Sequence, residues 1–235
     1  MESTRQLNPA EAASPSAHRS SLLTRIVWTL LSPGRLFEEL RAEPRSFGVL
    51  AVGAVAVCIA NAAVPAELWE QVIQARLLSA GEEVPEDLSG GATFARWSAA
   101  LGSLVFWPIL IMLVAGLYNV VFRFGLGYRG AFRQYLSVTA HAMLIGAAGA
   151  LVLLPLRIFA QDVQLQLTLG ALLPEIGEGL LARSLAYLDL FNLWASGLIG
   201  LGASILDGSR SVGSSISFAI GVALLLALVL GATIA

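Results

Sequence analysis

Five long stretches of this sequence are free, or almost free, of charged residues. They contain 21, 26, 23, 23 and 25 residues, and only the fourth is interrupted, by Asp189. About 20 apolar residues in a helix cross the hydrocarbon core of a bilayer, and a helix satisfies its own backbone hydrogen bonds there. The sequence therefore predicts an all-α membrane protein, with a bundle of five transmembrane helices at 47–64, 97–122, 136–156, 186–206 and 214–233.

The overall composition supports a membrane protein and excludes several other classes. Hydrophobic residues make up 57% of the chain and charged residues only 13%, whereas soluble domains carry about 25% charged residues. The single Cys58 excludes a disulfide framework, and the net charge of −2 is too small to indicate a nucleic-acid partner. We find no spacing typical of a metal site or of a hydrolase nucleophile. We therefore expect no enzyme activity and no cofactor.

The arginines predict how the bundle is oriented. Ten arginines fall in the N-terminal segment and in the loops that the five spans place on the same side, and four fall on the other side. Cytoplasmic loops of membrane proteins carry an excess of Lys and Arg. We therefore expect the N-terminus in the cytoplasm and the C-terminus outside.

The segment before the first span divides into two parts. Residues 1–20 are rich in Ser, Ala and Pro, which predicts a disordered cytoplasmic tail. Residues 21–46 predict two cytoplasmic amphipathic helices, separated by a break at Ser32-Pro33-Gly34. The apolar side chains of the second helix, such as Phe37, either pack against the bundle or form a docking surface for a cytoplasmic partner.

Three connecting segments also carry patterns. Ala66–Ser79 predicts another amphipathic stretch, on the outer side. Leu167–Leu173 and Leu180–Leu185 predict interfacial helices or a re-entrant hairpin around Pro174 and Gly177. Residues 125–130 match the G-x-G-x-x-G pattern, but a dinucleotide site needs a preceding strand. A membrane span ends there instead, so these glycines predict a tight turn.

Asp189 is the most costly residue in the predicted spans, because a carboxylate in the bilayer must be paired, solvated or functional. Asn192 lies three residues further along the chain, on the same helical face. Two groups of other spans lie at a similar depth, namely Asn61 and Arg157. An Asp189–Arg157 ion pair or an Asp189–Asn61 hydrogen bond would fix the packing of the helices. The functional alternative is a proton, ion or substrate site at Asp189.

His141 is a less favourable candidate for such a site. The third span begins on the inner side, so His141 is expected more than about 10 Å from Asp189 along the bilayer normal. We interpret it as a hydrogen-bonded packing residue. Small residues, among them Gly149 and Gly200, indicate close helix packing in the third and fourth spans.

Three stretches resemble a known family. They are Leu31–Leu40 (LSPGRLFEEL), Gly130–Val138 (GAFRQYLSV) and Leu188–Trp194 (LDLFNLW). In this order, with five spans, the chain resembles the bacterial branch of the Yip family of membrane proteins, whose eukaryotic members interact with Rab/Ypt GTPases. The resemblance implies a bacterial inner-membrane protein with a five-span fold and a cytoplasmic N-terminus. It marks as motif positions Pro33, Phe37, Phe132, Asp189 and Trp194.

Two functions follow as expectations. The first is a non-enzymatic protein that organises the membrane or recruits a cytoplasmic or membrane partner through its N-terminal helices. The second is a small transporter or channel that uses Asp189. Besides the lipid bilayer, a second copy of the chain is a candidate partner.

Overall fold

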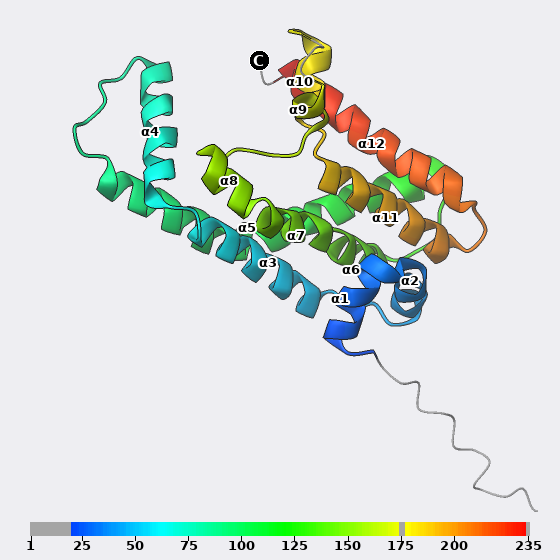
Figure 1. The fold of residues 1–235 in the computed structure, drawn as a ribbon. Coiled ribbons are helices and arrows are strands. Elements are labelled where there is room, and N and C mark those ends of the chain that lie inside the picture. Colours follow the sequence, from blue (N-terminus) through cyan, green and yellow to red (C-terminus); the bar gives the residue numbers. More distant parts are fainter. Residues whose placement is uncertain (1–19, 174–176, 234–235) are drawn as a thin grey trace, which may run out of the picture.

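The computed structural model describes residues 20–173 and 177–233, and within these ranges it is built from helices without a strand. Nearly all of the predicted tail, residues 1–20, and the hairpin apex at Pro174 lie outside the described residues. Figure 1 shows the helices α1 and α2 at one end of the molecule and α4, α8, α9 and α10 at the other. We call the second of these the α4–α10 end.

Four helical segments of the described chain are long and apolar enough to cross a membrane. The first segment is α5 (Ser89–Val120), which continues into the π-helical turn η2 (Val121–Gly125). The second consists of three consecutive helices, α6 (Phe132–Ala142), α7 (Leu144–Val152) and α8 (Leu154–Ala160). The third and fourth are α11 (Leu190–Asp207) and α12 (Val212–Thr233). A fifth is counted if α3 (Phe47–Ala62) and α4 (Ala66–Ala80), which meet at an angle of 82°, form one span. The chain is thus a multi-pass membrane protein.

The span boundaries differ from those expected, and each difference has a local cause. Helix α5 begins eight residues before Trp97, because its first two turns pack along α4 beyond the length that a bilayer needs. The third span is longer than 136–156 and is broken at Met143 and Leu153. The fourth span was expected to begin at Ala186, but α11 begins at Leu190, because Asp189 caps it.

The two N-terminal helices are present, and they use their apolar faces differently. Helix α1 (Leu22–Leu31) buries Arg25 and Thr29 and leaves Leu23 and Leu31 74% and 77% exposed. Helix α2 (Pro33–Ala42) has Pro33 in its first turn and packs against α11 and α6. Its side chains of Leu36, Phe37 and Leu40 are fully buried. The apolar face of α2 is therefore part of the core, as the packing alternative predicted.

The core lies between α2, α5, α6, α11 and α12. Phe122 is surrounded by the rings of Tyr118, Tyr128, Tyr135 and Phe218, with centroids 5.0 to 6.2 Å away. Helices α11 and α12 approach closely at a glycine. A Cβ atom on Gly200 would lie 2.6 Å from the Cα atom of Ile216, so the backbones meet directly there.

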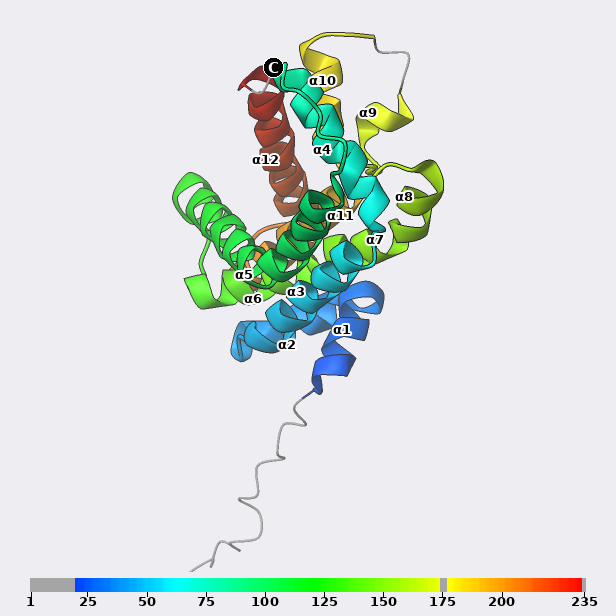
Figure 2. The ribbon, with the colours of Figure 1, turned by 90° about the vertical axis from the view of Figure 1, so that its left-hand side faces the viewer.

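The α4–α10 end extends past the bundle (Figure 1). Helix α4 packs along α5, and the short helices α9 (Leu169–Leu172) and α10 (Leu180–Ala186) pack against each other, with α10 also on α12. Helices α9 and α10 confirm that the predicted segments Leu167–Leu173 and Leu180–Leu185 contain helices. Viewed from the side, α12 is inclined away from α5 (Figure 2).

Candidate functional site: a cleft with a polar end

Asp189 is the N-cap of α11. Its Oδ1 atom accepts a hydrogen bond of 3.0 Å from the backbone N–H of Asn192, the interaction for which Asp is favoured at helix starts. An isolated antiparallel bridge joins Asp189 to Thr168, which caps α9 in the same way. The N–H of Leu169 donates to the Leu188 carbonyl, and the N–H of Leu190 donates to the Leu167 carbonyl, both at 2.9 Å. Backbone hydrogen bonds thus hold the chain on both sides of Asp189, and the Asn192 N–H holds its carboxylate.

Neither expected partner reaches Asp189. The Nε atom of Arg157 donates to the Leu165 carbonyl at 3.0 Å, and Nδ2 of Asn61 contacts the Ala99 carbonyl at 3.5 Å. No ion pair or hydrogen bond joins Asp189 to either residue in the described part of the chain. The expectation of a direct pair was wrong because the Asp189 side chain is directed to the start of α11, which it caps, and other elements hold the two partners.

Asp189 instead lies at the end of an apolar cleft. The cleft has a volume of about 320 Å³, with α5 and α12 as walls and α11 as floor. Asp189, Asn192 and Ser196 all line it, so one face of α11 carries a stripe of polar groups along the floor. Ser196 accepts a hydrogen bond of 3.1 Å from the Tyr118 hydroxyl. The rest of the lining is mostly hydrophobic, as in pockets for small apolar or amphipathic molecules.

Two further pockets connect this cleft to the α4–α10 end. A joint pocket of about 160 Å³ shares Asp189 and Asn192 with the cleft, and it also contacts Arg157. A larger vestibule of about 890 Å³ shares Arg157 with the joint pocket and Tyr187 with the cleft. Asn61 lines this vestibule as well. The four residues singled out from the sequence therefore line adjoining pockets, although only Asp189 and Asn192 are hydrogen-bonded to each other within the described residues.

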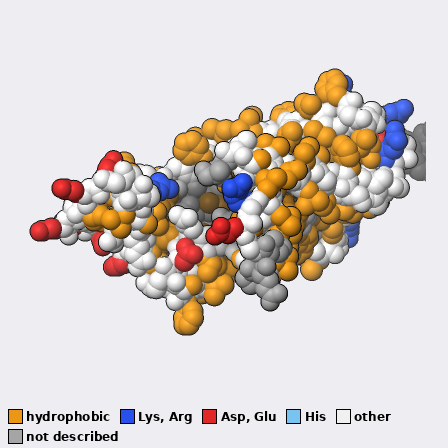
Figure 3. Space-filling model, turned by 90° about the horizontal axis from the view of Figure 1, so that it is seen from above, with side chains coloured by type: hydrophobic (Ala, Val, Ile, Leu, Met, Phe, Trp, Pro, Cys, Tyr) orange, Lys and Arg blue, Asp and Glu red, His pale blue; other side chains and the backbone are white. Residues whose placement is uncertain are grey.

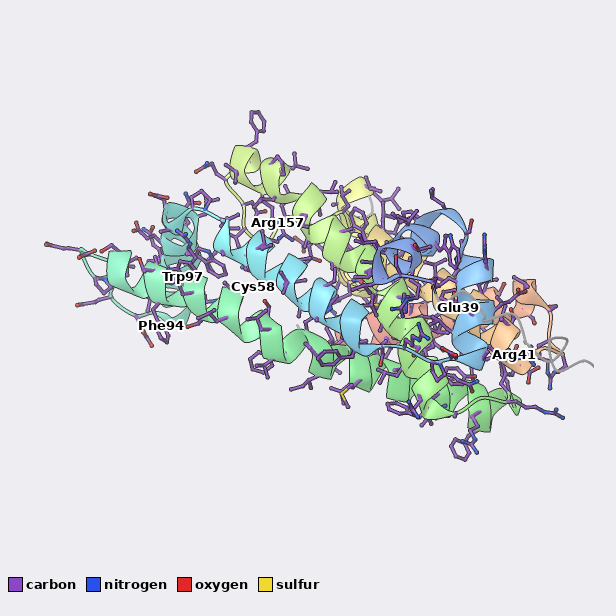
Figure 4. The ribbon with its side chains drawn as sticks, turned by 90° about the horizontal axis from the view of Figure 1, so that it is seen from below. Glu39, Arg41, Cys58, Phe94, Trp97 and Arg157 are labelled. Atoms are coloured by element: carbon purple, nitrogen blue, oxygen red, sulfur yellow. The ribbon has the colours of Figure 1, made fainter. Side chains whose placement is uncertain are left out.

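The surface of this end is mixed in character. Figure 3 looks onto it and shows basic and acidic side chains close together in the middle of the face, beside hydrophobic areas. A second group of acidic side chains lies at the tip of the α4–α5 arm. Figure 4 places Arg157 in the half of the molecule that also contains Phe94 and Trp97, away from Glu39 and Arg41. The cleft thus opens toward a polar chamber at one end of the bundle.

His141 lies apart from these pockets. It is fully buried in α6, and its Nδ1 atom is 2.7 Å from the Ser137 carbonyl. A carbonyl only accepts, so Nδ1 carries the proton. The Nε2 atom has no partner among the described residues. This environment agrees with a packing residue.

The glycine motif forms a turn between spans. Gly127 and Gly130 have positive φ angles of 69° and 132°. The N–H of Arg129 donates to Oδ1 of Asp207 at 3.0 Å, and the Tyr128 hydroxyl lies 2.7 Å from Oγ of Ser215. The turn is thereby tied to both ends of the α11–α12 connection.

The remaining family-motif positions lie outside the site. Phe37 is in the core, whereas Phe132 and Trp194 are largely exposed on the surface of the spans. Reasoning from the sequence missed Trp107 and Tyr118, which bring α5 to the cleft. Ser196 could have been found, because it lies seven residues after Asp189 and so on the same helical face.

Comparison of the chain with protein-family models, with curated proteins and with solved structures found no match.

Proposed function

We propose that this chain is a non-enzymatic membrane protein that binds an amphipathic, membrane-resident molecule in the cleft, as a transporter or as a binding protein. One observation carries the proposal. Asp189 has no ion-pair partner in the described chain, and it lies where an apolar cleft meets polar pockets. An amphipathic molecule fits such a lining, because its apolar tail can contact the hydrophobic side chains and its polar group can contact the polar ones.

The cleft is tested by filling it. Ala223 of α12 lines the cleft, whereas the adjacent Leu224 does not and is exposed. We expect Ala223→Phe to lower the amount of amphipathic molecule that copurifies with the protein in mild detergent, measured by mass spectrometry of an organic extract. Leu224→Phe is the matched control and should leave it unchanged. Equal amounts in the two variants would exclude the cleft as the binding site.

Asp189→Asn separates charge from capping. Asn is as good an N-cap as Asp, so this variant should keep the stability of the wild type. It removes the negative charge, and we expect it to change ligand retention, or flux in proteoliposomes, at least about fivefold. Unaltered retention and flux would show that Asp189 acts only as a cap.

A second proposal is membrane organisation or partner recruitment through the N-terminal helices. It is supported by α1, whose large apolar side chains face outward while Arg25 faces the bundle. Burial and the charge of Arg45 lower the pKa of Arg25, and Glu39 partly opposes this. Helix α2 offers no free apolar face, so we assign the role to α1, with the lipid leaflet as its contact. The depth of Leu31 in the bilayer tests this role.

The orientation and the origin are also proposals. The ten-to-four distribution of arginines supports a cytoplasmic N-terminus in a bacterial inner membrane, with α3 as the first of five spans and the vestibule outside. The three motif stretches support membership of the Yip family. Ser79 is exposed at the end of α4. A cysteine placed there in a Cys58→Ser background should react with a membrane-impermeant maleimide from the outside only.

A further inference from the structure

The vestibule is rich in hydrogen-bond donors. Arg157 and Arg76 both line it, and neither forms an ion pair within the described ranges. Arg157 uses Nε for the Leu165 carbonyl, which leaves its terminal N–H groups for another acceptor. The Trp69 side chain also lines this chamber, and its indole nitrogen is buried without a partner among the described residues. A buried donor without an acceptor is costly, so this side of the chamber favours a ligand that supplies acceptors.

The acidic groups of the chamber are fewer. Asp162 is the only carboxylate among the described vestibule residues, and its Oδ1 atom accepts from the backbone N–H of Gln164 at 2.8 Å. Asp189 lies beyond Arg157, in the joint pocket and the cleft. The lining of the vestibule has two positive side chains and one negative side chain, and the charge of Asp189 also acts on Arg157. The excess of one positive charge in the lining favours an anionic group.

The size and position of the chamber narrow the class of anion. A guanidinium group binds phosphate through paired N–H groups, and basic pockets at membrane surfaces bind lipid headgroups. The vestibule of about 890 Å³ is far larger than a carboxylate requires, and Tyr187 lines both it and the apolar cleft. A molecule with its polar end among the arginines can thus extend its tail along the hydrophobic side chains that α5 and α12 contribute to the cleft.

We propose that the ligand of the cleft is a phospholipid, with its phosphodiester bound by Arg157 and Arg76 in the vestibule and an acyl chain in the cleft. This inference rests on the proposed function, because it assigns a headgroup to the amphipathic molecule bound there. The phosphate chemistry has two sources, an intact lipid or a soluble phosphate ester. Only the intact lipid has an acyl chain, so a requirement for the acyl chain distinguishes the two sources.

The experiment compares three probes on the full-length protein in detergent, by native mass spectrometry. They are dioleoylphosphatidylglycerol, dioleoylglycerol, which has the same tails without phosphate, and glycerophosphoglycerol, which has the headgroup without tails. We expect the wild type to retain the phospholipid at least about tenfold better than either fragment, the range expected for charge-assisted hydrogen bonds.

The variants assign that preference to the vestibule. Arg157→Gln should lower phospholipid retention about tenfold and leave dioleoylglycerol retention unchanged. Arg76 is exposed, and its side chain forms no hydrogen bond with the described residues, so Arg76→Gln should preserve the fold and lower retention in the same direction. Arg96→Gln is the matched control, because Arg96 lies on α5 outside the vestibule, beside Trp97.

The outcomes separate this inference from the proposed function. Equal retention of phospholipid and dioleoylglycerol, unchanged in both vestibule variants but lowered by Ala223→Phe, would overturn the headgroup and leave the cleft intact. Equal binding of glycerophosphoglycerol and phospholipid would overturn the lipid and point to a soluble phosphate ester. If no probe is retained and Ala223→Phe has no effect on copurifying molecules, the proposed function of the cleft as a binding site is refuted.

Discussion

Gly200 is the position at which the packing of α11 against α12 can be tested most directly. An added Cβ atom would lie 2.6 Å from both the Ile216 Cα atom and the Ser215 carbonyl oxygen. Carbon atoms in contact lie about 3.5–4.0 Å apart, so the two helices would have to separate by about 1 Å. Both atoms belong to the backbone and cannot rotate away. We therefore expect Gly200→Ala to lower the free energy of unfolding.

Gly197 provides the matched control for this change. It lies in the same helix, and an added Cβ atom would meet no atom within 4 Å. Each substitution gains the same helix propensity, up to about 1 kcal/mol in favour of Ala. The difference between the two variants therefore isolates the overpacking, for which about 1–3 kcal/mol is typical.

The assay is unfolding by sodium dodecyl sulfate in detergent micelles, followed by tryptophan fluorescence. We expect Gly197→Ala to match or slightly exceed the wild type and Gly200→Ala to unfold at a lower denaturant fraction. If the two variants unfold at the same point, α11 and α12 do not meet at Gly200.

Two further predictions concern the N-terminal helices. Phe37→Ala should lower the free energy of unfolding by about 3–5 kcal/mol, because the side chain is fully buried. The control Phe47→Ala, at a position 86% exposed, should lower it little. Similar losses for the two variants in denaturant titrations would contradict a core role for α2. A fluorophore on Leu31→Cys, in a Cys58→Ser background, should be quenched by lipid-borne nitroxides in vesicles. Quenching by aqueous iodide alone would show that α1 is free of the leaflet.

The helices were largely predictable because long charge-free windows and amphipathic spacing are properties of the sequence alone. The residues at which the helices begin and end were less predictable. A count of charges marks the residues that a bilayer requires, but α5 extends past Trp97 because α4 supports it. Asp189 shows a different limit. Its depth was estimated by treating it as part of the helix, although an Asp before an apolar run is a typical N-cap.

The candidate site was predicted only in part. Depth along each span correctly brought Asp189, Asn192, Asn61 and Arg157 toward one end, but depth does not say which way a helix is rotated. Rotation decides that Arg157 turns to the Leu165 carbonyl and that Trp107 lines the cleft. These contacts depend on how helices far apart in the sequence pack, and periodicity within one helix does not contain that information.

The buried face of α2 has a consequence for how the chain is made. Synthesis runs from the N-terminus, and α2 precedes α11, its main packing surface, by about 150 residues. During that interval α2 lacks its main packing surface, so Leu36, Phe37 and Leu40 are incompletely covered. A truncated or stalled chain would display these three side chains, and a finished one hides them. The exposure of these side chains on α2 thus distinguishes incomplete from complete chains, and quality-control factors that bind exposed apolar side chains can recognise it.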